Sequence, residues 1–200
     1  MRRRAAGVLS RGLLVTLFAG FAWANYARWR STGEPSGLGT TLLEAWVAVL
    51  FLVRRPTSNV SSRRLAWIAA PIGSFAMLLA RPESGGLPQL PCEVVQLFGV
   101  AVALLSLGTL GRSFGLVAAN RGVKTAGPYG LVRHPAYTGY LIAYLGYTAE
   151  NPSLRNFALL ALSTAFQLVR IREEERVLSG DAGYRTYTSR VRFRLVPYVY

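Results

Sequence analysis

The segment Gly127–Gly139 holds the only histidine of the chain, His134, between Arg133 and Pro135 and directly before an apolar stretch. Proline suits the first turn of a helix and favours an extended backbone at the residue before it, so a helix is predicted to begin at Pro135. Backbone donors at a helix start, beside an arginine, favour binding of a carboxylate. Two interpretations follow: an anion-binding corner, or a basic anchor beside a membrane whose histidine is already hydrogen-bonded.

Turn-forming residues precede this corner. Asn120-Arg121-Gly122 and Gly127-Pro128-Tyr129-Gly130 are both sequences in which the backbone can approach a ligand closely. After the corner, Tyr137, Tyr140, Tyr144 and Tyr147 are spaced three, four and three residues apart, which puts them on one face of a helix. Tyr144 and Tyr147 are interpreted as packing residues, whereas Tyr137 and Tyr140 lie near enough to His134 to contact a ligand.

A second polar group lies in the run Arg170–Leu178. On a helix, Ile171, Glu174, Glu175 and Leu178 share one face, so two carboxylates interrupt an apolar stripe. Arg170 is expected to pair with Glu173 or Glu174, and Arg172 with Glu175. An ion-paired solvated helix is the alternative to a binding site. Apart from Asp181, these acids are the only ones predicted on the same side of the membrane as His134.

The elements that position these groups are predicted from composition. The 200 residues are 52% hydrophobic and 16% charged, with a mean hydropathy of +0.29, which indicates an integral membrane protein. Six apolar segments, most of them about 16 residues long, approach the length that crosses a bilayer. These segments are 12–27, 38–53, 65–80, 94–110, 137–149 and 154–169. The predicted fold is all-α, a polytopic transmembrane bundle of about six spans, with five as the alternative.

The basic residues predict the orientation of these spans. With the N-terminus in the cytoplasm, all 23 basic residues are predicted to lie in loops or tails. Only four of them, Arg28, Arg30, Arg81 and Arg155, lie on the side of the membrane opposite the cytoplasm. This asymmetry follows the positive-inside rule and predicts that both termini are cytoplasmic. The formal charge of +14 therefore indicates topology, and no nucleic-acid partner is expected. The start Met1-Arg2-Arg3-Arg4, with the apolar run and Ala22-Trp23-Ala24, would also suit a cleavable signal peptide, although a first span is favoured.

The chain divides by its chemistry. Residues 1–111 are predicted to form a four-span N-terminal bundle, and residues 112–200 a core of one cytoplasmic loop, two spans and a tail. In the first part only Glu44 stands out, as an acid in the second span that either pairs within the bundle or serves a function. With one histidine and one cysteine, the usual zinc-ligand spacings are absent, so no metal is expected.

The later motifs resemble the isoprenylcysteine carboxyl methyltransferase family, within the membrane methyltransferases that include the phospholipid N-methyltransferases. The resemblance covers roughly residues 105–197 and rests on three motifs. They are Gly127-Pro128-Tyr129 followed by Arg133-His134-Pro135-Ala136-Tyr137-Thr138-Gly139, then Arg170, Ile171, Glu174, Glu175 and Leu178, and finally Tyr184, Tyr187, Arg190, Val191 and Pro197. It implies S-adenosylmethionine (SAM) bound between the loop and the last helix, open to the cytoplasm, with a lipophilic acceptor entering from the bilayer.

This resemblance, together with the chemistry of the side chains, assigns site residues. Expected catalytic residues are His134, Arg170 and Glu174. Expected SAM-binding residues are Gly127, Tyr129, Arg133, His134, Pro135, Tyr137, Gly139, Glu174 and Glu175. Expected acceptor-binding residues are Asn120, Arg121, Tyr140 and Arg172.

The acceptor is left open among related chemistries. The family resemblance implies the carboxylate of a prenylcysteine-like or other lipid, and the alternative within the same class is the amine of a phospholipid headgroup. A non-catalytic transporter or scaffold, and a reductase using a nicotinamide cofactor, are the alternatives from other classes. For the nicotinamide case no phosphate-binding glycine fingerprint is present. The expected location is a bacterial inner membrane, crossed several times, with the active site facing the cytoplasm.

Overall fold

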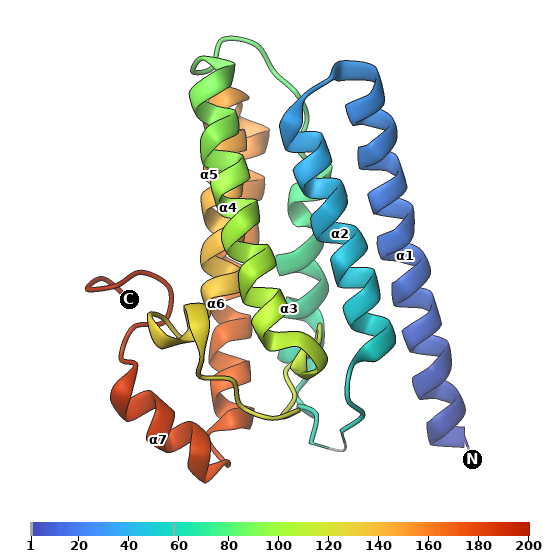
Figure 1. The fold of residues 1–200 in the computed structure, drawn as a ribbon, viewed down its shortest axis with the longest axis vertical. Helices are drawn as coiled ribbons and strands as arrows, with labels where there is room; N and C mark the ends of the chain where they lie inside the picture. Colours follow the sequence, from blue (N-terminus) through green and yellow to red (C-terminus); the bar gives the residue numbers. More distant parts are fainter. Residues whose placement is uncertain (1, 58) are drawn as a thin grey trace.

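The computed structural model describes residues 2–57 and 59–200, with side chains described from residue 11 onward. Within these ranges the chain is helical, and its only β-type pairing is an isolated bridge between Val60 and Ala119. Figure 1 shows the long helices side by side as one bundle. They are α1 (Arg2–Thr32), α2 (Pro35–Val53), α3 (Arg64–Phe75), α4 (Gln89–Leu110), α5 (Pro135–Glu150) and α6 (Leu154–Leu178), with the short α7 (Ala182–Arg190) after them.

Short 3₁₀ helices adjoin three of these elements: η1 (Ala76–Leu79) continues α3, η2 (Gly111–Ser113) continues α4, and η3 (Gly127–Gly130) precedes α5. Five of the six predicted apolar segments therefore lie within one helix each, whereas the segment 65–80 covers α3 and η1 and ends just beyond them. By length and composition, two helices could cross a membrane, Pro35–Val53 and Gln89–Ser113, and Arg64–Leu79 is a shorter apolar helix. The number of spans stays a prediction.

Large apolar side chains point outward along the bundle, as expected where lipid rather than water surrounds a protein. Trp23 and Leu13 of α1 are each 70% exposed, and similar residues are found on the other helices. They include Leu52, Trp67, Ile68, Phe98, Leu105 and Phe157. The apolar interior is therefore small, and closely packed helices fill much of it.

The tightest packing joins α4 to α5 through small residues. A Cβ atom added to Gly139 would lie 2.6 Å from the carbonyl oxygen of Gly99 and 2.6 Å from the nitrogen of Ala103. One added to Gly99 would overlap the backbone nitrogen of Ala143. Because the two backbones nearly touch, α5 has a fixed position relative to α4, as in small-residue contacts of membrane helices. This contact sets the position of His134 at the start of α5.

The bundle has two chemically different ends. The N-terminus, the loop 54–63, the loop 111–134 and α7 lie together at the lower end of Figure 1, here called the inner end. The connections 33–34, 80–88 and 151–153 lie at the opposite, outer end. The loops that carry most of the basic residues predicted to share a side thus lie at one end of the bundle. The side chains of Arg2, Arg3 and Arg4, which belong to that prediction, lie outside the described part, as does Met1.

Candidate active site

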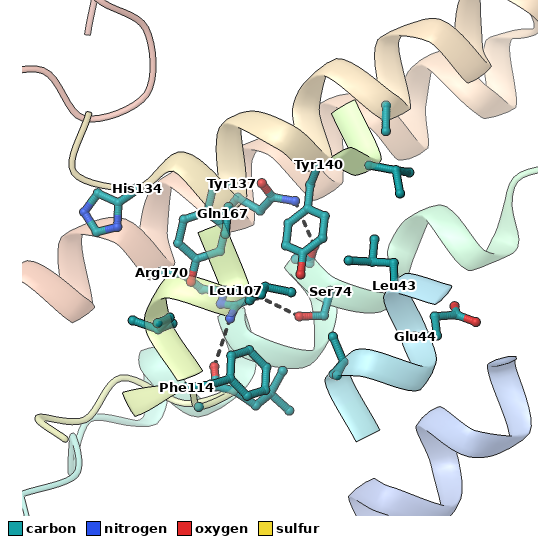
Figure 2. Close-up of a pocket in the computed structure, with 18 of the residues that line it drawn as sticks. Leu43, Glu44, Ser74, Leu107, Phe114, His134, Tyr137, Tyr140, Gln167 and Arg170 are labelled. Atoms are coloured by element: carbon teal, nitrogen blue, oxygen red, sulfur yellow. Dashed lines mark hydrogen bonds between the residues drawn. The ribbon is translucent and has the colours of Figure 1, made fainter. Parts of the chain in front are cut away.

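A cavity of about 400 Å³ lies inside the bundle and receives side chains from all six long helices. Its inner chamber is defined here by Arg121, Tyr129, His134, Tyr137, Arg170, Glu174 and Tyr184. Its outer chamber is defined by Phe18, Phe21, Asn25, Leu43, Glu44, Phe75 and Tyr144. Figure 2 shows His134 and Glu44 on opposite sides of this region, with Tyr137, Arg170 and Tyr140 between them. The predicted division of the chain at residue 111 stays a prediction, since both parts line the same cavity.

His134 is placed by α5 and by the C-terminal tail. It is the residue before the helix, with Pro135 in the first turn as expected, and its backbone N–H donates to the carbonyl of Arg194 at 2.8 Å. Its imidazole is only 6% exposed and lies between two carboxylates of α6. Nε2 is 3.3 Å from Glu175 Oε1, and Nδ1 is 3.7 Å from Glu174 Oε2. The structure therefore brings the two predicted motifs into contact.

Glu174 and Glu175 are adjacent in sequence but have different surroundings. Glu174 lines the cavity and accepts a short hydrogen bond from the hydroxyl of Tyr137. Glu175 is absent from the cavity lining and instead binds three basic side chains. Arg133 Nε is 3.2 Å from Oε1, His134 shares that oxygen, and Arg194 Nε donates to Oε2 at 2.9 Å.

Glu175 therefore ties α6 to the His134 corner and to the tail. Burial disfavours its charged form, but hydrogen bonds from His134 and Arg194 outweigh burial and hold the pKa of Glu175 below its ordinary value. Burial alone would lower the pKa of the Arg194 guanidinium, but its hydrogen bond to the Glu175 carboxylate outweighs burial and raises that pKa.

Arg170 lies deep between the two chambers and is 7% exposed. Its guanidinium donates to the hydroxyl of Ser74 at 2.7 Å and to the carbonyl of Leu116 at 3.0 Å, and it lies 5.0 Å from the ring centre of Tyr137 (Figure 2). Its Nε has no hydrogen-bond partner, and within the described residues no carboxylate is within 4.0 Å. A buried cation without a counter-ion is costly, so this position favours an anionic or electron-rich ligand.

The predicted pairing of Arg170 with Glu173 or Glu174 is therefore wrong, and so is that of Arg172 with Glu175. Glu173 pairs with Arg176 at 2.8 Å and with Arg63 at 3.5 Å, on the side of α6 that faces away from the cavity. The spacing of these residues along α6 permits such pairs. Arg170 and Glu175 instead bind groups that neighbouring helices and loops provide.

Three tyrosines close the inner chamber. The hydroxyl of Tyr187 donates to the carbonyl of Tyr129 at 2.7 Å, which joins α7 to η3. Burial raises the pKa of Tyr187 to about 12 and raises that of Tyr184 further, so both are neutral phenols at physiological pH. Tyr184 is 5% exposed and its hydroxyl has no partner. An orphaned buried hydroxyl facing a cavity indicates room for a polar ligand group.

The loop 111–134 brings further cations to the inner chamber. Arg121 lines the cavity, and its Nε donates to the carbonyl of Arg55 at 3.2 Å. Burial, followed by repulsion from Arg54, lowers the pKa of Arg121 to about 10, so this side chain is still a cation at neutral pH. Asn120 does not line the cavity, because its amide donates to Asp181 at 3.1 Å at the start of α7.

Other predicted site residues lie outside the cavity lining. Gly139 and Pro135 are buried at the α4–α5 contact and in the first turn of α5. Gly127 adopts a φ of +58°, which glycine tolerates best, and opens the η3 turn that carries Tyr129. Arg172 is exposed on α6, whereas Tyr140 lines the cavity beside Tyr137. The roles predicted for all of these residues stay predictions.

Two groups of contacts in the cavity have no signal in the sequence. Ser74 and the carbonyl of Leu116, which hold Arg170, come from segments in which no motif was visible. The aromatic residues Phe18, Phe21 and Phe75 of the outer chamber were counted only as apolar span residues. Their composition gave no sign that they line a cavity rather than face lipid.

Comparison with known proteins agrees with these motifs. Residues 90–181 match the phospholipid methyltransferase family. Over 198 residues the chain is 28% identical to methanethiol S-methyltransferase from a Pseudomonas species, covering 92% of this chain and 71% of that protein. Over 93 residues it is 38% identical to the cobalt-zinc-cadmium resistance protein CzcN of Cupriavidus metallidurans, covering 40% of this chain and 43% of that protein. The chain thus spans less than half the length of CzcN.

The helical bundle has exposed apolar faces, two helices that could cross a membrane, and an internal cavity with polar and apolar walls, which together suggest an integral membrane protein. Both methyltransferase matches support a membrane methyltransferase family of the isoprenylcysteine carboxyl methyltransferase and phospholipid methyltransferase type.

Proposed function

We propose that this chain transfers a methyl group from SAM to a lipophilic acceptor at the cytoplasmic leaflet of the membrane. The observation that supports this most is the continuity of the cavity. A polar chamber with His134, Tyr137 and Glu174 opens into an aromatic and aliphatic chamber lined by α1, α2 and α3. Such an arrangement lets a water-soluble donor and an apolar acceptor meet between the helices.

The inner chamber suits the chemical groups of SAM. Arg121 and Arg133 are cations for its carboxylate, Glu174 is an anion for its ammonium, and Tyr129, Tyr184 and Tyr187 offer rings and a free hydroxyl for the adenine and the sulfonium. When bound, SAM supplies a methyl group that is already activated by its sulfonium. Catalysis then rests mainly on positioning and on exclusion of water.

Arg170 and Glu174 are proposed to act on the acceptor side of this chamber. The guanidinium of Arg170 is fixed by Ser74 and Leu116 and would hold an acceptor carboxylate in place. Glu174, held by Tyr137, would accept a proton where the acceptor is protonated. His134 keeps the two carboxylates of α6 aligned with α5.

A thiol acceptor is a second candidate. The relative that aligns with 92% of this chain is a methanethiol S-methyltransferase, so the likeness includes the helices of the outer chamber as well as the motifs. A thiol must lose its proton for reaction, and Glu174 is the carboxylate of the inner chamber that could take it. Amine methylation, which the phospholipid methyltransferase match suggests, would also require Glu174 to accept a proton from the acceptor.

The inner end is proposed to face the cytoplasm, and the chain to cross the membrane several times. The cluster of basic residues at that end supports this orientation. Cysteine labelling at Thr57 and Ser84, which lie in loops at opposite ends, would test it in intact cells. Labelling of Thr57→Cys without permeabilisation would contradict the orientation.

Titration calorimetry with SAM on the purified protein tests the proposal directly. The unmutated protein is expected to bind SAM, and His134→Ala and Glu174→Ala are each expected to weaken binding at least tenfold, or about 1.4 kcal/mol. Glu83→Ala, an exposed acid at the outer end, is the matched control and is expected to bind normally. Absence of binding by the folded, unmutated protein would reject a methyltransferase and favour a transporter or scaffold.

Transfer of labelled methyl groups then identifies the acceptor. Lipid extracts, a prenylcysteine analogue and methanethiol are supplied separately with labelled SAM. Label in one of these pools, lost in Glu174→Ala, would assign the acceptor class. Label in none of them would contradict the acceptor part of the proposal.

A further inference from the structure

The outer chamber contains an aromatic cluster that the proposed chemistry does not use. The ring centres of Phe18, Phe21 and Phe75 are 5.8 to 6.0 Å apart, and all three side chains line the cavity. Across the chamber, Tyr140 and Tyr144 of α5 stack with ring centres 6.4 Å apart. Aromatic faces gathered around a cavity are the usual surroundings of an organic ammonium group.

A carboxylate lies among these rings. Glu44 is 8% exposed, lines the chamber, and accepts one hydrogen bond, from the side chain of Asn25 at 2.8 Å. Within the described residues, no basic side chain is within 4.0 Å of it. Figure 2 shows its carboxylate on the side of the cavity opposite His134. A buried acid without a cationic partner is costly unless a ligand supplies the positive charge.

Most of the charges at this end of the cavity are negative. Glu93 lies 3.4 Å from Ser36, and Glu150 accepts from Gln96 at 2.7 Å; both Ser36 and Gln96 line the cavity. Glu34 pairs with Arg28 at 3.1 Å. Acids therefore outnumber bases around the outer half of the cavity, whereas arginines dominate the inner half. This field favours a cation in the outer chamber.

We propose that Glu44, Asn25 and the surrounding aromatic rings form a binding site for an organic ammonium group carried by the methyl acceptor. This inference rests on the proposed function, because it assigns one end of the acceptor. Seven residues of α5, about 10 Å along a helix, separate Tyr137 at the donor site from Tyr144 beside this chamber. The acceptor is thus an elongated molecule, with its reacting group near Arg170 and its ammonium group near Glu44.

The structural alternative is a polar contact that only joins α1 to α2. In that case Glu44 is protonated and Asn25 is its sole partner. The two roles differ in one property: a binding site distinguishes a cation from a neutral molecule of the same length, and an interhelical contact does not.

Calorimetry in a non-ionic maltoside detergent separates these roles with two probes of equal chain length, hexyltrimethylammonium and 1-hexanol. The unmutated protein is expected to bind the ammonium probe at least tenfold more tightly than hexanol. Glu44→Gln is expected to remove most of that preference while SAM affinity changes less than twofold. Phe21→Leu, which keeps an apolar side chain but removes the ring, is expected to weaken binding of the ammonium probe about threefold and of hexanol much less. Glu83→Gln is the matched control and should retain the preference.

The outcomes separate this inference from the proposed function. Normal SAM binding with no ammonium preference, or with a preference that survives in Glu44→Gln, would overturn the ammonium site alone. Equal loss of both probes and of SAM in Glu44→Gln would show that Glu44 holds α1 and α2 together, which also overturns it. Ammonium binding that depends on Glu44, in a protein that never binds SAM, would support the site as a cation pocket and reject methyl transfer.

Discussion

The inner and outer chambers of one cavity are built in opposite ways. Around the inner chamber, charged groups are fixed by ion pairs and hydrogen bonds: Glu175, just outside the lining, binds Arg133, His134 and Arg194. In the outer chamber, phenylalanine and tyrosine rings line the cavity together with Glu44, which accepts a hydrogen bond from Asn25. The family match begins at residue 90, so it leaves out α1, α2 and α3, which line the outer chamber.

This difference indicates that the two chambers have separate roles. Binding a donor such as SAM demands many charged groups held in fixed positions, and fixed groups require supporting ion pairs and hydrogen bonds. Choosing an acceptor demands mainly shape and a few polar contacts on apolar walls. The two chambers should therefore respond differently to substitution, and the following predictions test that difference.

The largest effect is expected from Glu174→Gln. This change keeps the size of the side chain and its contact with Tyr137 but removes the charge in the inner chamber. Loss of one preorganised electrostatic group costs about 3 kcal/mol of transition-state stabilisation, or roughly a hundredfold in rate. Labelled-methyl transfer measures the rate, and binding of hexyltrimethylammonium to the outer chamber should be unchanged. A variant with near-normal transfer would remove Glu174 from the proposed mechanism.

The next effect concerns the contact that positions both chambers. In Gly139→Ala, the new Cβ would lie 2.6 Å from the backbone of α4, so the helices must move apart at a cost of about 2 kcal/mol. Thermal unfolding in detergent measures this loss. Gly108→Ala is the control, because no atom lies within 4 Å of its added Cβ, and it should be neutral or slightly stabilising. If both variants unfold alike, the close contact of α4 and α5 is not what holds α5.

A smaller effect is expected from Glu175→Gln, with a defined pH dependence. The folded protein holds the pKa of Glu175 below its ordinary value of 4.5, so its contribution is present above that pH and is lost as pH falls through the folded pKa. The variant should be about 1.5 kcal/mol less stable at pH 7, since three charge-assisted contacts are weakened. Its unfolding temperature should also change less than that of the unmutated protein between pH 5 and pH 3. Parallel pH profiles for the two proteins would contradict the assignment.

The sequence predicted the helices well because hydrophobic runs and basic loops are one-dimensional signals. It also predicted that the His134 corner meets the Glu174 and Glu175 pair, since both lie at the same end of the bundle. It did not separate these two glutamates, because neighbouring positions on a helix differ by only about 100° and the packing of the tail decides which one faces the cavity.

The outer chamber could not be predicted for a different physical reason. An aromatic side chain that faces lipid and one that lines a cavity have the same hydropathy, so Phe21 and Trp23 look alike in sequence. Only the arrangement of α1, α2 and α3 shows that Phe21 lines the cavity while Trp23 is 70% exposed. The partners of Arg170 were hidden likewise, because Ser74 and Leu116 lie about 96 and 54 positions away along the chain.

The smallest effect tests whether α7 serves the inner chamber alone. Tyr187→Phe removes the hydroxyl that donates to the carbonyl of Tyr129 and leaves that buried acceptor unpaired, at a cost of about 1 kcal/mol. Because α7 packs on η3 and not on the outer chamber, SAM affinity should fall severalfold while the preference for hexyltrimethylammonium over hexanol stays. Tyr198→Phe, at a tyrosine that is 90% exposed, controls for loss of a phenol in the same tail. A change in both the SAM affinity and the ammonium preference would mean that the chambers are coupled through α6. The separate roles inferred for the two chambers would then be wrong.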